Sequence, residues 1–344
     1  MGFQRLDPQD IIVSIESATA AAWSNSLPTL TTFFTSSAQE GNTTGNYYLD
    51  VYQTSSSDTS AAIQFSIAYA DLDGSGSTLY NVLVTGSSPS RTLYGQYRNL
   101  ILGSEYSSFV FGNVTSSYFH AISIERARYK EHLLPGTMTL LISGSLGTIS
   151  LTDDSYLGVT NYVDAGRVYN LISGSAGVKT SSTTFSPLGW TAASGSYGWF
   201  LPDVGLILLN GLAMSGSTFA ANGSPSVPIS RSFNSNGLNN RKMFQALSGS
   251  TSKSWLLNSQ ETLSSDYAFI RARSGEFNYT ENPSYISSST GEIVYSSFIN
   301  NPVTYVTTVG LYNDNNDLLA VAKLSRPLQK DFTKELLVRV RLDF

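Results

Sequence analysis

The last seven residues alternate strictly between apolar and charged side chains. The apolar positions are Val338, Val340, Leu342 and Phe344, and the charged positions are Arg339, Arg341 and Asp343. Alternation with a period of two is typical of a β-strand with one buried face. The pattern therefore predicts a strand that begins at Leu336 and turns its apolar side toward a core.

The segment before this strand predicts a hairpin. On one side of an extended chain it would place Val303, Tyr305, Thr307, Val309 and Leu311. Residues 313–317 are all Asn or Asp, whose short polar side chains hydrogen-bond their own backbone and favour turns. A second strand and a short charged connector then lead to the last strand. We expect three closing strands.

The first 142 residues also contain extended patterns. Residues 61–70 place Ile63, Phe65, Ile67 and Tyr69 on one face, as expected of a half-buried strand. Residues 100–111 and 119–124 also read as strands. Charged side chains followed by Pro135-Gly136 make residues 125–133 the best helix candidate in this part.

Residues 143–265 are poor in charge and rich in Gly and Ser. Their short apolar pieces predict brief strands joined by tight turns, with one helix near residues 240–247. The expected fold is mostly β, built from antiparallel β-sandwich-like modules with few short helices. We expect a β-rich N-terminal domain over residues 1–142, a Gly/Ser-rich β domain over 143–265 that is inserted, and a C-terminal β unit over 266–344 that packs on the first.

The composition limits the classes of function. Charged residues make up 13% of the chain, about half the usual share, which lowers the electrostatic barrier to subunit contacts. The net charge is -5 and no basic block occurs, so nucleic-acid binding is not expected. With no cysteine, disulfides and thiolate metal sites are excluded. The longest apolar run, residues 204–213, is too short for a membrane helix, so we expect no membrane insertion.

One acidic stretch resembles the start of a calcium-binding loop. Asp71, Asp73 and Ser75 with Gly76 occupy the first, third, fifth and sixth positions of such a loop. The twelfth position is Val82, where calcium loops need a bidentate carboxylate. The pattern favours a plain hairpin turn over a metal site, and we expect no metal or other cofactor.

Candidate catalytic groups are few. Asp153 and Asp154 are adjacent, so on an extended chain they point apart and cannot readily share a proton or a metal. His120 and His132 have no nucleophile motif beside them, which favours structural roles. Two carboxylates suffice for glycan cleavage, which keeps a glycan-cleaving enzyme among the alternatives. We nevertheless expect no catalytic residues.

The tryptophans allow two interpretations. They are Trp23, Trp190, Trp199 and Trp255. Aromatic rings stack on sugars in glycan-binding surfaces, and they also fill cores and interfaces. Core packing is the favoured interpretation, with a host-glycan platform as the alternative.

Several stretches resemble a family of virus proteins. They are VTTVGLYNDNNDLLAVAKLSRPLQK with the closing LLVRVRLDF, YGQYRNL from Tyr94, ISIERARYKE from Ile122, LPG from Leu134, GWFLPDVG from Gly198 and FNYTENP from Phe277. Together they are similar to virion structural proteins of contractile-tailed phages, chiefly those that infect cyanobacteria. The resemblance implies a virion location, in the tail and most specifically its baseplate, after assembly in the bacterial cytoplasm.

The expected role is that of a non-enzymatic building block. Its partners would be other tail or baseplate proteins and copies of itself, with transient contact to the host surface as a further possibility. Unpaired N–H and C=O groups on a strand edge can be completed by a partner chain. The interface candidates are Tyr312, Leu336, Val338, Arg339, Val340, Arg341, Leu342 and Phe344. The alternatives are a receptor- or glycan-binding tail module, a fibre-attachment adaptor and, less favoured, a glycan-cleaving tail enzyme.

Overall fold

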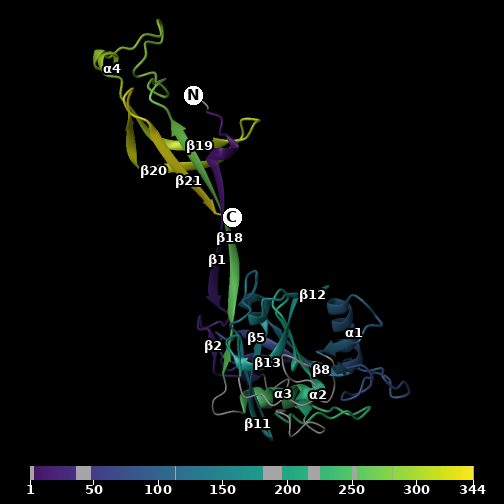
Figure 1. Cartoon of the computed structure of the whole chain (residues 1–344). Coiled ribbons are helices and arrows are strands. Elements are labelled where there is room, and N and C mark those ends of the chain that lie inside the picture. The colour runs from purple at the N-terminus through teal and green to yellow at the C-terminus, as the bar shows by residue number, and fades with distance from the viewer. Residues whose placement is uncertain are drawn as a thin grey trace. The chain divides into compact units, whose positions relative to one another are not determined.

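The structure is a computed structural model and consists mainly of β-strands (Figure 1). It describes residues 4–35, 48–112, 114–180, 196–215, 225–249, 254–280 and 282–343. Strands account for 44% of the residues and helices for 14%. The mostly-β expectation is confirmed.

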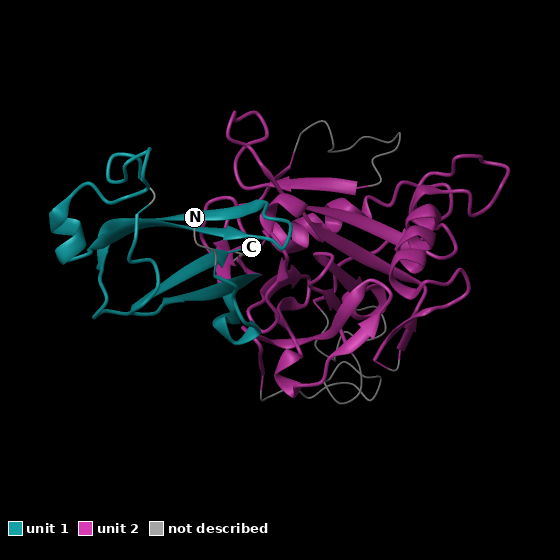
Figure 2. Cartoon of the chain, turned by 90° about the horizontal axis from the view of Figure 1, so that it is seen from above, with its two compact units in different colours: residues 1–17, 262–344 teal, residues 18–261 magenta. Residues whose placement is uncertain are grey.

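The chain divides into two compact units (Figure 2). Unit 1 comprises residues 1–17 and 262–344, and unit 2 comprises residues 18–261. The expected boundary between residues 142 and 143 is wrong, because the hairpin of β10 (Thr139–Gly144) and β11 (Gly147–Asp153) spans it, with Ser143 paired to Thr148. The scarcity of charged residues after residue 142 therefore does not mark a domain boundary. Residues 143–261 of the expected inserted domain belong to unit 2, together with most of the expected N-terminal domain.

Unit 2 is built on one curled antiparallel sheet of 13 strands. Its order is β2-β17-β10-β11-β13-β15-β16-β8-β5-β4-β3, with β12 and β14 paired to β13. The remaining bounds are β2 (Thr29–Leu30), β3 (Phe34–Thr35), β4 (Tyr48–Tyr52), β5 (Ile63–Asp71), β8 (Tyr118–Ile124), β12 (Asn161–Val163), β13 (Gly166–Ser175), β14 (Val178–Lys179), β15 (Gly198–Leu201), β16 (Leu206–Asn210) and β17 (Trp255–Leu256). Two smaller pieces are the ribbon of β6 (Phe109–Phe111) and β7 (Val114–Ser116), and β9 (His132–Leu133), which pairs with β18 (Asn258–Ala272).

The central strands of this sheet are buried on both faces. In β5, Phe65 and Ile67 join one hydrophobic core, whereas Ala68 and Ala70 join a second core. β16 behaves in the same way, and all five of its residues are buried. Strands covered on both sides lose the alternation of apolar and polar positions, and this explains the continuous run LILLN in β16.

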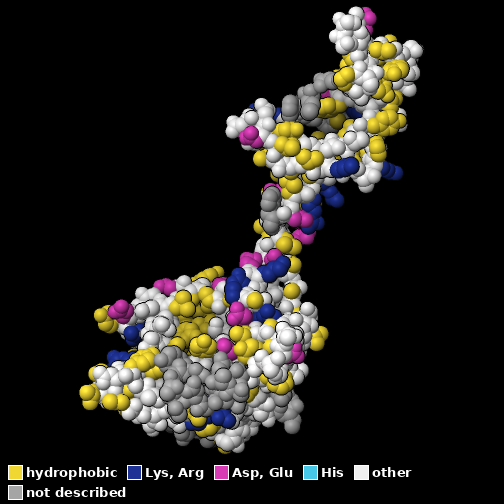
Figure 3. Space-filling view, turned by 180° about the vertical axis from the view of Figure 1, so that it is seen from behind, with side chains coloured by type: hydrophobic (Ala, Val, Ile, Leu, Met, Phe, Trp, Pro, Cys, Tyr) yellow, Lys and Arg dark blue, Asp and Glu magenta, His cyan; other side chains and the backbone are white. Residues whose placement is uncertain are grey.

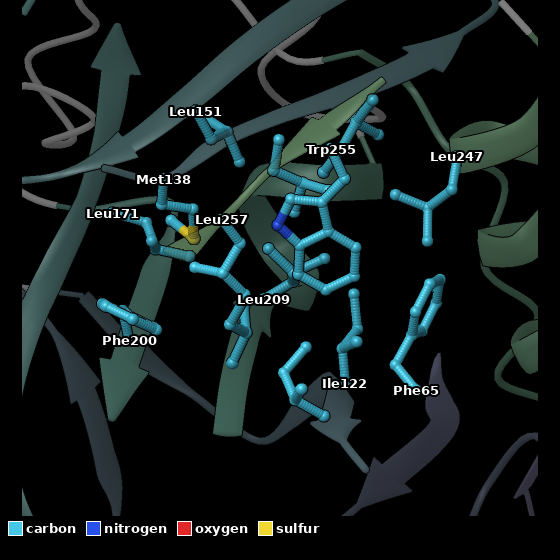
Figure 4. Packing of buried hydrophobic residues seen from close by; sticks show 14 of the residues in the cluster. Phe65, Ile122, Met138, Leu151, Leu171, Phe200, Leu209, Leu247, Trp255 and Leu257 are labelled. Atoms are coloured by element: carbon cyan, nitrogen blue, oxygen red, sulfur yellow. The ribbon is translucent and has the colours of Figure 1, made fainter. Parts of the chain in front are cut away.

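An aromatic cluster forms the centre of the larger core (Figure 4). Trp255 of β17 is fully buried, and its ring centroid lies 4.7 Å from that of Phe65 and 5.0 Å from that of Trp23. β17 lies near one end of the strand order and β5 near the other. Their contact therefore shows that the sheet curls around this core.

The described residues contain four α-helices. They are α1 (Pro89–Leu102), α2 (Gly211–Ser215), α3 (Asn239–Ser248) and α4 (Ser296–Asn300). The helix expected near residues 240–247 is confirmed by α3. The strand expected over residues 100–111 is wrong at its start, because α1 runs to Leu102 and ends at Gly103, whose φ of 58° is left-handed. Proline at the first helical position of α1 is a start signal that favours this outcome.

The helix expected over residues 125–133 is also wrong. Only Arg126–Arg128 form one 3-10 turn, and His132–Leu133 then form β9. This segment has few apolar residues to form the buried face of a helix. Leu133 is instead buried in the larger core, and its backbone N–H donates to the carbonyl of Pro202.

Unit 1 contains two small sheets whose side chains share a core. The first has the order β1-β18-β21, and the second is the hairpin β19-β20. Their bounds are β1 (Ile11–Ala21), β19 (Thr304–Tyr312), β20 (Leu318–Lys330) and β21 (Leu336–Asp343), preceded by a 3-10 turn at Pro8–Asp10. The boundaries between the units fall within β1 and β18. The three closing strands predicted from the sequence are present.

The expected single face of the first hairpin strand is wrong in part. β19 has a register irregularity between Val306 and Thr308, opposite the segment of β20 that contains Pro327. Proline cannot donate a ladder hydrogen bond and is found at such bulges. Val309 and Leu311 therefore pack on the unit 1 core, whereas Tyr305 is 62% exposed.

Candidate functional site

The last strand, β21, supports the core of unit 1. Val338 and Val340 are 9% and 5% exposed, and with Ala268 they are the buried members of this core among the described residues. Arg339 and Arg341 point to the other side, where both guanidinium groups lie within 6 Å of the Tyr267 ring. The predicted alternation is confirmed from Leu336 to Asp343. Phe344 lies outside the described residues.

β21 also has a free backbone edge. Within the described residues it pairs only with β18, from Leu336 opposite Ala272 to Asp343 opposite Ser265. β1 lies at the other edge of the same sheet. Tyr312, the remaining interface candidate, is at the end of β19 and 39% exposed, on the hairpin face opposite to that of Leu311. The structure therefore groups the β21 candidates together and places Tyr312 apart from them.

Unit 1 has a thin core and many exposed apolar side chains. In β1 the exposed fractions are 45% for Ile11, 53% for Ile12, 60% for Val13 and 70% for Ile15. Figure 3 shows hydrophobic side chains over much of the visible face of unit 1. Contiguous apolar surface of this kind marks interaction sites in soluble proteins.

A buried lysine closes one end of unit 1. Lys330 is fully buried, and its Nζ donates to the carbonyl oxygens of Ser274 and Asp331 at 2.9 Å each and to Oδ1 of Asn278 at 2.8 Å. All three donors of the ammonium group are thus satisfied. The lysine ties the turn after β18 to the end of β20.

The stretch that resembles a calcium loop holds an arginine. Asp71 is fully buried, and its Oδ2 accepts from Nε of Arg231 at 2.7 Å, while Nη2 of Arg231 donates to Asp73 at 3.1 Å. The guanidinium also lies 4.3 Å from the centre of the Tyr118 ring. Oδ1 of Asp71 accepts from the backbone N–H of Asp73, as in an Asx turn. The turn is followed by irregular chain and α1, not by the second strand of the expected hairpin.

Further polar groups extend this cluster into the interior of unit 2. The hydroxyl of Tyr69 donates to Asp71 at 3.0 Å, and burial together with this carboxylate raises the pKa of Tyr69. The His120 ring lies beside Tyr69, and its Nε2 is 3.1 Å from the carbonyl oxygen of Asn239. A carbonyl oxygen can only accept, so Nε2 carries the proton and Nδ1 is left buried without a partner. This arrangement suits a neutral imidazole.

Burial lowers the pKa of His120 to about 4. The unfolded chain binds this proton near pH 6.5, so between these values the unfolded state holds more protons than the folded state. The free energy of unfolding is therefore at its full value above pH 6.5 and decreases as the pH drops toward 4. We expect the titration of His120 to lower the free energy of unfolding of unit 2 by about 3 kcal/mol over that pH range, on the basis of ~1.4 kcal/mol for each pKa unit.

The measurement is urea unfolding at several pH values, with tryptophan fluorescence as the signal. All four tryptophans lie between residues 18 and 261, so the signal reports on unit 2. In a His120→Gln control the amide still donates to Asn239 but cannot titrate. The free energies of unfolding of the wild type and the variant should diverge below pH 6.5. If they depended on pH in the same way, the buried neutral histidine would be contradicted.

The other candidate groups have structural partners. Both carboxylate oxygens of Asp153 accept from the backbone N–H of Gly136 at 2.9 Å, while Asp154 accepts from the backbone and side chain of Asn170. Burial raises the pKa of Asp154. The two carboxylates thus bond to separate segments, Asp153 to the turn at Gly136 and Asp154 to strand β13, as predicted for adjacent residues that point apart. His132 is paired with Gln260 at 3.2 Å.

Most tryptophans lie in the cores. Trp23 and Trp255 are buried, and Trp199 packs partly buried against Phe109 and Phe111. Trp190 lies outside the described residues. Across the described ranges, no three acidic or histidine side chains come together to hold a metal ion.

Sequence reasoning missed two cations with structural roles: Lys330, which is fully buried, and Arg231, which is partly exposed but pairs with the buried Asp71. Arg231 is the one charged residue between residues 215 and 235, and an isolated charge in an apolar, small-residue stretch is a signal for a buried ion pair. Lys330 gave no such signal, since it follows other basic residues of β20.

None of the described helices has the length and apolar character needed to cross a membrane. A scan of protein-family models, a search of curated proteins and a search of solved structures found no match to this chain.

Proposed function

We propose that this chain is a non-enzymatic structural component of a contractile phage tail, placed in the baseplate, where it holds neighbouring subunits through unit 1. The observation that carries the proposal is the uncovered apolar surface on unit 1, together with free strand edges at β1 and β21. A unit with so few fully buried side chains gains stability when a partner covers it. The resemblance to tail proteins supports the virion as the place where such partners are found.

The buried polar groups of unit 2 support the non-enzymatic part of the proposal. Asp71, Asp153 and Asp154 are each held by protein donors and lie at most 7% exposed. His120 is fully buried beside a packed core. A catalytic acid or base must reach substrate, and these side chains serve turns and strand ends instead.

The test is to locate the chain in purified particles. We expect mass spectrometry of tails separated from heads to recover it in the tail fraction at a fixed ratio to a major tail protein. Density for both units should then be found at the baseplate in the intact particle. Recovery only from the lysate supernatant would contradict the proposal.

A second candidate function is binding of host glycan, supported by aromatic residues in unit 1. Tyr279, Tyr285 and Tyr295 are 56%, 40% and 50% exposed, and the rings of Tyr285 and Tyr295 lie 5.2 Å apart. Exposed aromatic faces can stack on sugars. Binding of the isolated protein to host envelope polysaccharide, lost in Tyr279→Ala/Tyr295→Ala, would favour this function.

A further inference from the structure

Two exposed apolar surfaces of unit 1 lie on different strands. We define the β1 row as Ile11, Val13 and Ile15, and the hairpin patch as Leu318, Leu319 and Val321 of β20. The side chains of the hairpin patch are 53%, 68% and 58% exposed. Each surface therefore presents three large apolar side chains to solvent.

The β1 row lies on the core-facing side of its sheet. Glu16 approaches Arg341 to 3.8 Å, so it shares the side of Arg341, and the side chains of odd-numbered residues in β1 point to the opposite side. That opposite side is the one on which Val338 and Val340 are buried. On this side of the sheet, the exposed fractions are 5–9% for Val338 and Val340 of β21 but 45–70% for the residues of the β1 row. The hairpin thus covers the β21 part of the sheet and leaves the β1 part uncovered.

The hairpin cannot cover the β1 row with the hairpin patch of its own chain. Ala322 and Leu324 of β20 pack inward on the unit 1 core, so the intervening alternation turns Val321 outward. The hairpin patch therefore faces away from the sheet to which the β1 row belongs. A contact between the two surfaces needs two copies of the chain.

Charge favours the contact of unlike surfaces. β19 carries no charged residue, and the exposed charges of β20 are Lys323 and Arg326, while Asp314 and Asp317 lie in the turn directly before Leu318. The segment that leads into β1 carries Arg5, Asp7 and Asp10 and is acidic on balance. Packing of β20 on β1 of another copy brings Lys323 and Arg326 toward Asp7 and Asp10, whereas two β1 rows would oppose segments that are both acidic on balance. The unlike pairing is the complementary one.

We propose that the hairpin patch of one copy packs on the β1 row of a second copy. The contact joins two different surfaces, so it is heterologous and repeats into a closed ring or an open chain. This proposal deepens the assembly role given above and rests on it for its biological setting. It requires only this chain, so it can fail while the tail location stands.

The experiment uses the purified full chain and sedimentation velocity at a series of concentrations. We expect the wild-type chain to form oligomers, and Val13→Asp or Val321→Asp to weaken association roughly 100-fold, because each buries an unpaired carboxylate in the contact. Leu83→Asp in unit 2 is the matched control, since Leu83 is 90% exposed and lies on neither surface. It should associate like the wild type.

Mixing the two variants distinguishes the heterologous contact from other arrangements. Val13→Asp keeps an intact hairpin patch and Val321→Asp keeps an intact β1 row, so an equimolar mixture should form one-to-one dimers that grow no further. A wild-type chain that remains monomeric at tens of micromolar, or a mixture that remains monomeric, would overturn the proposal.

Charge reversal tests the same contact without the Val13→Asp and Val321→Asp variants and so does not depend on whether those two variants fold. Lys323→Glu/Arg326→Glu should weaken association of the chain with itself. Addition of an Asp7→Lys/Asp10→Lys chain should restore heterologous contact. Absence of any change with these substitutions would contradict the charge argument and with it the unlike pairing.

Discussion

Deletion of residues 339–344 is expected to unfold unit 1 and to block particle assembly, while unit 2 stays folded. The deletion removes Val340, one of the three buried side chains of the unit 1 core among the described residues, and the backbone partners of β18 from Ser265 to Phe269. The sheet β1-β18-β21 is then reduced essentially to two strands, which are marginal in water. Limited proteolysis should cleave the region 262–338 rapidly, whereas the tryptophan unfolding transition of unit 2 should be unchanged.

The matched control for this deletion is Arg339→Ala/Arg341→Ala. It removes the charged side of the same strand, including the contacts to Tyr267 and the ion pair of Arg341 with Asp343, and keeps the apolar side. These side chains are exposed, so unit 1 should stay folded. Normal particles that carry the truncated chain in the usual amount would contradict the assembly role of this strand.

The sequence predicted those parts of the fold that have one buried face. The alternation in β21 is confirmed because Val338 and Val340 meet a core while Arg339 and Arg341 meet solvent. Strands buried on both sides have no alternation to detect, and for β16 the length of the apolar run was the only signal. The boundary at residue 142 failed because charge content follows the surface and not the hydrogen bonding of β10 with β11.

Helices were harder to locate than strands, for a physical reason that differs at each site. Start and stop residues define α1, which has little apolar periodicity. The charge pattern over residues 125–133 predicts a helix, but His132–Leu133 form strand β9. The short apolar segment 293–298 is compatible with a strand or a helix, and Ser296–Asn300 form α4. Short apolar runs do not distinguish the two structures without their tertiary partners.

The buried sites depended on contacts that no local pattern contains. Asp71 and Arg231 are 160 residues apart, and Lys330 and Asn278 are 52 residues apart. The sequence identified the Asp71 turn but not the cation that fills it. Sequence spacing can indicate a site only when its members lie on one local segment.

Replacement of Arg231 by methionine is expected to destabilise unit 2 by about 3 kcal/mol. Asp71 is fully buried, and the substitution leaves its carboxylate without a cation, although Tyr69 and two backbone N–H groups still donate to it. Breaking a buried pair from one side costs about 3–5 kcal/mol, and the Arg231 side chain is 34% exposed, which favours the lower end. Urea unfolding at pH 7, with tryptophan fluorescence as the signal, measures the decrease in the free energy of unfolding.

A second substitution separates a buried-charge penalty from lost packing. Asp71→Asn/Arg231→Met removes both charges and keeps the shape of the acidic side chain, so it should recover at least about 1 kcal/mol relative to Arg231→Met alone. Lys130→Met is the control, because Lys130 pairs with Glu261 at 2.6 Å but is 77% exposed, and its loss should cost under about 1 kcal/mol. If the single and double variants were equally stable, the role of Arg231 would be packing against Tyr118 and not neutralisation of Asp71. The distinction bears on the proposed function, because a carboxylate neutralised by Arg231 is better suited to holding the turn than to binding a cation.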